Sequence, residues 1–270
     1  MEYRERQPSR RLAGHIKRFW SLAYDPVDKA AGSETVLPDG CPEIIFNLSD
    51  RFRRIDSEAN EIQPATLFAG QMSRSIAIQP TGTVRLFGVR FHPAGAFPLG
   101  GFSMHELTDQ IIGIDCALGR EGLELEARIW EAKSFEQRTV AFEAFFLERL
   151  AARQRNDAIS NYAAGLIFGS DGLISVSHLS ERLGVSERRL ERRFKACVGV
   201  SPKMLARIVR FQGVVRKIQS AETPNMLDAV HELGYSDQSH LIRDFREFSG
   251  ETPLGYFEKT HHISDIFTAS

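Results

Sequence analysis

Residues 183–202 read LGVSERRLERRFKACVGVSP, and residues 233–253 read LGYSDQSHLIRDFREFSGETP. Six positions of the first stretch recur, identical or closely similar, 51 residues later. The matched positions are Leu190, Phe194, Lys195, Gly199, Ser201 and Pro202, and Leu241, Phe245, Arg246, Gly250, Thr252 and Pro253. A pattern repeated at a fixed spacing indicates one structural unit used twice. This repeat decides the fold expected for the second half of the chain.

Each copy is predicted to form a helix, a tight turn and a second helix. In the first copy, Val176, Leu179 and Leu183 share one helix face. Gly184 suits the left-handed residue that ends a helix, and Ser186 is the expected N-cap of the next helix. The turn and the cap therefore separate two short helices.

The second copy follows the same plan. Apolar residues within 229–233 lead to Gly234, and either Ser236 or Asp237 is the expected cap. On the second helix of each copy, apolar residues share one side and polar or basic residues lie opposite. A helix with an apolar back and a cationic front fits the DNA major groove, and the pairing indicates a helix-turn-helix unit.

Residues 233–246, with Gly250, Thr252 and Pro253, closely resemble the signature of the DNA-binding domain of AraC/XylS-type transcription regulators. The resemblance implies two helix-turn-helix units that are joined by a long helix and read successive major grooves. Residues 202–220 are the expected linker. Its residues 203–219 would span about 26 Å at about 1.5 Å each, while successive grooves on one DNA face lie about 34 Å apart.

The resemblance also implies which side chains face DNA. Positions 188, 191 and 192 and positions 238, 239, 240 and 243 are expected to face the bases. Glu191 departs from the family pattern and would accept a hydrogen bond from cytosine, and Ile242 would contact a thymine methyl group. The whole expected interface is Ser186, Arg188, Arg189, Glu191, Arg192, Lys195, Ser236, Gln238, Ser239, His240, Ile242, Arg243 and Arg246.

Length and composition limit the class of protein. A chain of 270 residues suggests about two domains, and 42% apolar with 26% charged residues is typical of a globular protein. No run of 18 apolar residues or apolar signal region occurs, which predicts no membrane association. The three cysteines are widely spaced, so we expect a cytoplasmic protein with no metal site and no cofactor.

Charge is unevenly distributed along the chain. The formal net charge is −1, yet residues 151–260 hold 16 basic against 13 acidic side chains, and residues 1–150 hold 18 against 21. Residues 186–195 alone carry five basic and two acidic side chains. This modest excess predicts weak non-specific DNA binding.

The predicted fold class is α+β, with residues 1–150 forming a β-rich sensor or dimerisation domain and residues 155–260 an all-α double helix-turn-helix domain. Short strands separated by Gly and Pro turns in residues 33–104 favour a barrel or sandwich, which the family resemblance suggests is cupin-like. Helical spacing is expected in residues 102–112 and 121–154. The segments 38–43 and 88–95 resemble an N-terminal domain often found ahead of this DNA-binding unit.

Five residues near predicted strand ends are candidates for an effector pocket: Asp39, Cys41, Glu43, Arg90 and His92. Polar groups in such positions orient a ligand. The structural alternative is that Asp39 caps its own turn and that Arg90 pairs with a carboxylate. Catalytic motifs and clustered metal ligands are absent from the sequence, so no enzymatic activity is expected.

The sequence therefore predicts a sequence-specific transcription regulator, which in this family is more often an activator. Its expected partners are double-stranded DNA and, by the resemblance, RNA polymerase. A small-molecule effector and a homodimer are further expectations. Two alternatives stay open: a ligand-binding or enzymatic β-barrel with a secondary DNA-binding tail, and a dimeric regulator that needs no effector.

Overall fold

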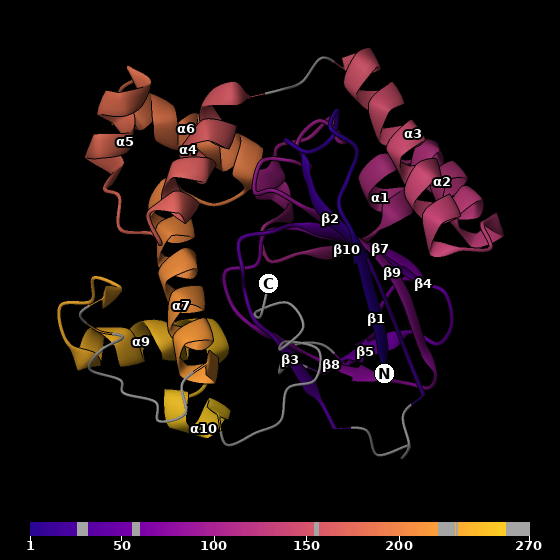
Figure 1. The fold of residues 1–270 in the computed structure, drawn as a ribbon, viewed down its shortest axis with the longest axis horizontal. Coiled ribbons are helices and arrows are strands. Elements are labelled where there is room, and N and C mark those ends of the chain that lie inside the picture. The colour runs from indigo at the N-terminus through magenta and orange to yellow at the C-terminus, as the bar shows by residue number, and fades with distance from the viewer. Residues whose placement is uncertain (26–31, 56–59, 154–156, 221–229, 231, 258–270) are drawn as a thin grey trace.

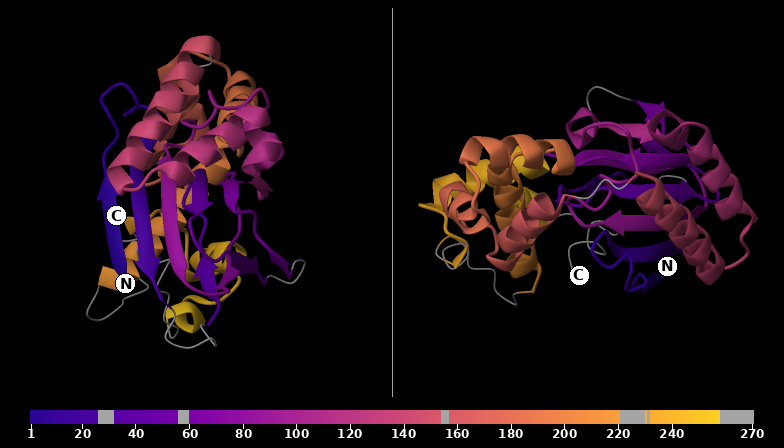
Figure 2. Two further views of the ribbon diagram at one scale, coloured as in Figure 1. Left: turned by 90° about the vertical axis from the view of Figure 1, so that its right-hand side faces the viewer. Right: turned by 90° about the horizontal axis from the view of Figure 1, so that it is seen from above.

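The computed structural model describes residues 1–25, 32–55, 60–153, 157–220, 230 and 232–257. Its N-terminal half is built on β-sheets and its C-terminal half is helical, so the α+β prediction is confirmed (Figure 1). Helix α7 (Pro202–Ser220) separates two groups of helices, with the sheets beside it (Figures 1 and 2). Among the described residues, no helix is long and apolar enough to cross a membrane.

Two antiparallel sheets form the N-terminal half. The larger has the order β1-β2-β9-β4-β7-β10, and the smaller has the order β3-β8-β5-β6. The larger sheet comprises β1 (Glu2–Arg6), β2 (Ile16–Tyr24), β4 (Glu43–Asn47), β7 (Thr66–Ala69), β9 (Val84–Phe91) and β10 (Ile111–Gly113). The smaller sheet comprises β3 (Glu34–Val36), β5 (Phe52–Arg54), β6 (Glu61–Ile62) and β8 (Ile76–Pro80).

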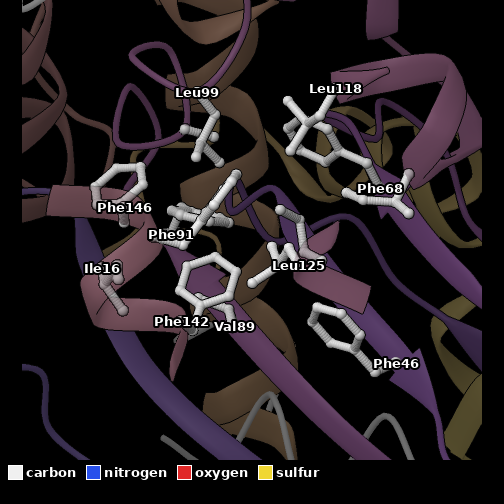
Figure 3. Packing of buried hydrophobic residues seen from close by; sticks show 14 of the residues in the cluster. Ile16, Phe46, Phe68, Val89, Phe91, Leu99, Leu118, Leu125, Phe142 and Phe146 are labelled. Carbon is white, nitrogen blue, oxygen red and sulfur yellow. The ribbon is translucent and has the colours of Figure 1, made fainter. Parts of the chain in front are cut away.

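Helices cover one face of the larger sheet. Successive strand residues point to opposite faces, so Val89 and Phe91 of β9 face the helices while Arg90 faces the smaller sheet. The covering helices are α1 (Ile114–Leu118), α2 (Arg120–Glu131) and α3 (Phe135–Arg153). Phe142 and Phe146 of α3 pack among these sheet residues in the main core (Figure 3).

The helical prediction for residues 121–154 is confirmed by α2 and α3 as far as residue 153, beyond which it lies outside the described residues, but that for residues 102–112 is wrong. Only a short 3-10 helix, η1 (Met104–Leu107), forms there. Strand β10 follows it and pairs with β7, with Ile111 opposite Ala69. Two adjacent β-branched residues favour an extended chain, and β10 hydrogen-bonds the edge that β7 would otherwise leave open.

The helical half comprises α4 (Ala158–Gly169), α5 (Val176–Leu183), α6 (Glu187–Val198), α7, α9 (Gln238–Ser249) and α10 (Pro253–Phe257). Gly184 ends α5 with a φ of 62°, and the Ser186 hydroxyl accepts from the Arg189 N–H at the start of α6. Asp237, rather than Ser236, caps α9 by accepting from the His240 N–H. Residue 229, part of the predicted first helix of the second unit, lies outside the described residues.

The packing of α3 predicts that two substitutions on this helix differ clearly in their effect on the free energy of unfolding. Phe142 is fully buried and its ring lies 6.0 Å from Phe19 and 6.2 Å from Phe91, between ring centroids. Phe142→Ala should lower the free energy of unfolding by about 3–5 kcal/mol because it leaves a cavity. Val140 is 60% exposed, and Val140→Ala should change it by less than about 0.5 kcal/mol. Urea denaturation measures both, and equal losses would contradict this packing.

Candidate DNA interface and adjoining cavity

Helix α6 has the two faces that the sequence predicts. Leu190, Phe194 and Cys197 are buried in the core of the first unit. The opposite face is exposed and consists of Arg188, Arg189, Glu191, Arg192 and Lys195, with Ser186 at its N-terminal end. Among the described residues, none of these basic side chains forms an ion pair. They are therefore available to an anionic partner.

Arg193 lies on the same helix but has a structural role. Its Nε lies 2.9 Å from Oδ2 of Asp157, whose Oδ1 accepts from the Ser160 N–H at the start of α4. The Cys197 thiol lies 3.4 Å from the same Oδ2. Asp157 thus caps α4 and holds α4 against α6. Its links to α6 were not predicted, because they join positions 36 and 40 residues apart.

Helix α9 presents a second outward face. Leu241, Phe245 and Phe248 are buried, and the Phe245 and Phe248 rings each lie 5.2 Å from the Phe211 ring of α7. Exposed residues are Ser236, Gln238, Ser239, Arg243 and Arg246, whereas His240 and Ile242 are half-buried. The predicted interface residues of this unit thus lie on one helix and at its N-terminal end.

His240 and Asp244 are both positioned by neighbours. The His240 Nδ1 lies 3.2 Å from the Ser236 hydroxyl, and its ring meets Tyr235 edge to face. Asp244 is turned inward and accepts from Arg207 of α7 at 2.8 Å. Arg207 also pairs with Glu247 at 2.6 Å, so α7 and α9 are joined by ion pairs as well as by packing.

Helix α7 contributes to both cores. Leu205 and Val209 lie in the core of the first unit, and Phe211 and Val215 lie in the core of the second. Its 19 residues correspond to about 28 Å of helix. The linker predicted at residues 202–220 is thus one continuous helix.

The N-terminal half contacts both helix-turn-helix units. The Gly199 carbonyl, just after α6, accepts from the Thr108 hydroxyl at 2.8 Å and lies 3.2 Å from Nδ1 of His105. At the other unit, the Ser75 N–H donates to the Phe248 carbonyl at 2.8 Å. The sheets and η1 are therefore hydrogen-bonded to the ends of both α6 and α9.

A third contact is made by residues 36–41, called here the strap. The Gln212 side chain of α7 donates to the Pro38 carbonyl at 2.8 Å, and Leu37 packs in the core of the second unit. Gly40 has a φ of +80°, and a Cβ built on it would lie 2.7 Å from Cδ1 of Leu205. A residue with a side chain would be strained there and would collide with α7.

The strap also closes a cavity of about 100 Å³ between the two sheets. Most of its lining is apolar, and its floor includes Trp20, whose indole occupies the space that a side chain at Gly88 would take. The polar lining residues are Asp39, Cys41, Glu43, Asn47, Gln63, Arg90 and Gln212. Four of the five predicted effector residues therefore share one cavity.

His92 is the exception. It lines a separate groove of about 740 Å³ with Lys17 and, from α4, Tyr162 and Phe168. Burial and the nearby Lys17 ammonium lower the pKa of His92. It follows the last residue of β9, so the chain has left the sheet before its side chain could reach the cavity.

Arg90 joins the acidic residues of the cavity wall. Its Nη1 donates to Oε1 of Glu43 at 2.8 Å, and its Nη2 contacts Oδ2 of Asp39. Oδ1 of Asp39 accepts from the Cys41 N–H at 2.8 Å, so the predicted turn cap and carboxylate pair are both present. Burial raises the pKa of Glu43 to about 7, although the Arg90 guanidinium opposes the increase.

Sequence reasoning missed Asn47, Gln63 and Gln212. Asn47 was detectable, because it lies four residues after Glu43 and points to the same face of β4. Gln212 carries no local signal, since its partner Pro38 is 174 residues away. Within the described residues, no cluster of three or more His, Cys, Asp or Glu side chains could hold a metal ion.

Comparisons with known proteins agree with this geometry. Residues 179–259 match the model of a helix-turn-helix domain, and residues 4–113 match a domain of unknown function, DUF6597. Regulatory protein HrpB of Ralstonia nicotianae (strain ATCC BAA-1114 / GMI1000) is 27% identical over 82 residues. That match covers 30% of this chain and 17% of HrpB, so the chain spans less than a fifth of this relative's length.

Two solved structures are also similar. ToxT from Vibrio cholerae is 11% identical with a TM-score of 0.51, and the match covers 89% of this chain and 98% of that one. This likeness shows the fold. The C-terminal domain of AraT, a response regulator from Geobacillus stearothermophilus, is 24% identical with a TM-score of 0.36, covering 40% of this chain and 96% of that one.

Two exposed basic helices on buried apolar backs define a helix-turn-helix DNA-binding protein. More specifically, the C-terminal half is an AraC-type helix-turn-helix domain, as the resemblance predicted, preceded by a DUF6597 domain.

The Asp157 contacts predict a pH-dependent stability. Burial alone would raise the pKa of this carboxyl, but the bonds from Arg193 and Ser160 lower it overall. The ionised form therefore stabilises the fold, and Asp157→Ala should lower the free energy of unfolding by about 1–3 kcal/mol at pH 7. The difference should shrink as pH falls below the usual value of about 3.9.

Urea denaturation at pH 7 and at pH 3 measures this difference. Glu148→Ala, at an exposed position of α3, is the control and should have little effect at either pH. If Asp157→Ala lowers the free energy of unfolding equally at both pH values, the carboxylate charge contributes nothing to stability.

Proposed function

We propose that the protein is a transcription regulator whose helices α6 and α9 enter two successive major grooves on one side of a DNA duplex. The observation that carries this proposal is that both helices expose basic side chains that form no ion pair within the described part of the chain, while their apolar backs pack on the shared helix α7. The length of α7, about 28 Å, approaches the spacing of about 34 Å between successive grooves.

The two faces divide into base-reading and phosphate-binding residues. In α6, Arg188, Glu191 and Arg192 are proposed to reach base edges, with Ser186, Arg189 and Lys195 nearer the phosphates. In and before α9, Gln238, Ser239, His240 and Arg243 reach bases, Ile242 contacts a thymine methyl group, and Ser236 and Arg246 contact phosphates. Phosphate contacts position the protein and base contacts supply specificity.

Recruitment of RNA polymerase and activation of transcription belong to the same proposal and come from the AraC/XylS resemblance. The DUF6597 half is proposed to sense a small-molecule effector in the cavity beside the strap. A ligand there would touch residues 36–41, which also contact α7 through Pro38 and Gly40. The strap therefore provides a direct route from the cavity to the helix that spaces the two units.

Base reading predicts that Arg192→Ala and Arg243→Ala each weaken operator binding by about 1–3 kcal/mol and relax discrimination at one base position. An operator is first selected from a random DNA pool with the full chain, and fluorescence anisotropy then measures affinity for operator and random duplexes. Arg128→Ala, at an exposed position of α2, is the control. Equal losses on both duplexes would reassign the two arginines to phosphate contacts.

Contact through the strap predicts that Gly40→Ala weakens operator binding, although residue 40 is not part of the proposed DNA face. The new methyl group would collide with Leu205 and strain the backbone, which should also cost about 1–3 kcal/mol of stability. Gly14→Ala is the matched control, because nothing lies within 4 Å of its added Cβ. Operator affinity unchanged in Gly40→Ala would show that the strap does not act on the DNA-binding half.

A further inference from the structure

We propose that the cavity binds a small aliphatic amine, takes the matching alcohol more weakly, and excludes the matching carboxylate. This rests on the proposed function, in which the same cavity is the effector site. One unsatisfied acceptor, the charge of the wall and the size of the cavity support it.

Sheet register places the polar groups of the cavity. Glu43 and Arg90 are direct neighbours across β4 and β9, so both point towards the smaller sheet. Ile45 and Asn47 follow Glu43 on the same face of β4. A ligand in the cavity therefore meets an apolar surface at Ile45 with an acceptor on either side of it.

Asn47 supplies an acceptor that the protein leaves unused. The side chain is 1% exposed, and its Nδ2 donates to the Pro64 and Ala65 carbonyls at 3.2 and 3.1 Å. Those two bonds fix the orientation of the amide. Its Oδ1 has no partner within the part of the chain that the structure describes. A buried acceptor without a donor costs about 1–3 kcal/mol, so a ligand that donates to it recovers this energy.

The charge of the wall favours a cation. The Arg90 guanidinium bonds two carboxylates, those of Asp39 and Glu43. Glu43 uses Oε1 for this bond, and its Oε2 adds a second acceptor. The next cation along the same row of the sheet, Arg18, is paired with Glu5 at 2.8 Å. A carboxylate ligand would meet excess negative charge, whereas an ammonium group would neutralise it.

The volume of the cavity limits the ligand to a small, compact molecule. The cavity of about 100 Å³ is smaller than an engineered cavity of about 150 Å³ that holds benzene. A branched chain of about five heavy atoms fits this volume. The apolar lining, which includes Trp20, Ile45 and Leu67, suits its hydrocarbon part.

The test compares isobutylamine, isobutanol and isobutyrate on the full chain at pH 7.5. Thermal shift and titration calorimetry should give tightest binding for the amine, weaker binding for the alcohol and none for the carboxylate. Glu43→Gln keeps the shape and an acceptor for Arg90 but removes the charge. This substitution should reduce the ratio of the amine affinity to the alcohol affinity by about tenfold. Glu131→Gln, at an exposed position of α2, is the control and should leave that ratio unchanged.

Ile45→Phe locates the site, because the larger ring fills the cavity and should abolish binding of all three compounds. Tighter binding of isobutyrate than isobutylamine, or no binding by any of the three, would overturn the proposed ligand class. Binding that survives Ile45→Phe would overturn the proposed site.

The experiments distinguish an error in the proposed function from an error in the proposed ligand class. If isobutylamine binds but operator affinity stays the same, the ligand class stands and the effector role is wrong. The Arg192 and Arg243 measurements use the unliganded protein, so their outcome does not depend on any ligand.

Discussion

Helix α7 buries Leu205 and Val209 in the core of one helix-turn-helix unit and Phe211 and Val215 in the core of the other. Shifting either unit relative to α7 would expose apolar surface to water. Each Å² exposed would cost about 25 cal/mol of free energy. The orientation of α6 with respect to α9 is therefore set by packing and by the ion pairs of Arg207. The proposal that two grooves are read together depends on this shared helix.

The DUF6597 half adds a second constraint on the same geometry. It is hydrogen-bonded to the end of α6 at Gly199, to the end of α9 at Phe248 and to α7 at Gln212. The contact at Gln212 is made by the strap, which is also a wall of the cavity. A change in the cavity therefore has a short physical path to the spacing of the two units.

Much of the fold could be predicted from local sequence, because capping, turn and periodicity signals act over a few residues. Gly184, Ser186 and the apolar stripe of α6 were predicted in this way and are confirmed. The helix expected at residues 102–112 was wrong, since pairing of Ile111 with β7 depends on a strand about 40 residues earlier. For the same reason Gln212 was missed. The pairing of Arg90 with a carboxylate was anticipated only as an alternative to a pocket, and the sequence did not indicate that Asp39 and Glu43 would share it.

The central claim is that one molecule places α6 and α9 in neighbouring grooves on one side of the duplex. Hydroxyl-radical footprinting of the full chain on its selected operator tests this most directly. The account predicts two protected patches, about one helical turn or 10 base pairs apart, on the same face of the DNA. A single patch, or two patches on opposite faces, would contradict it.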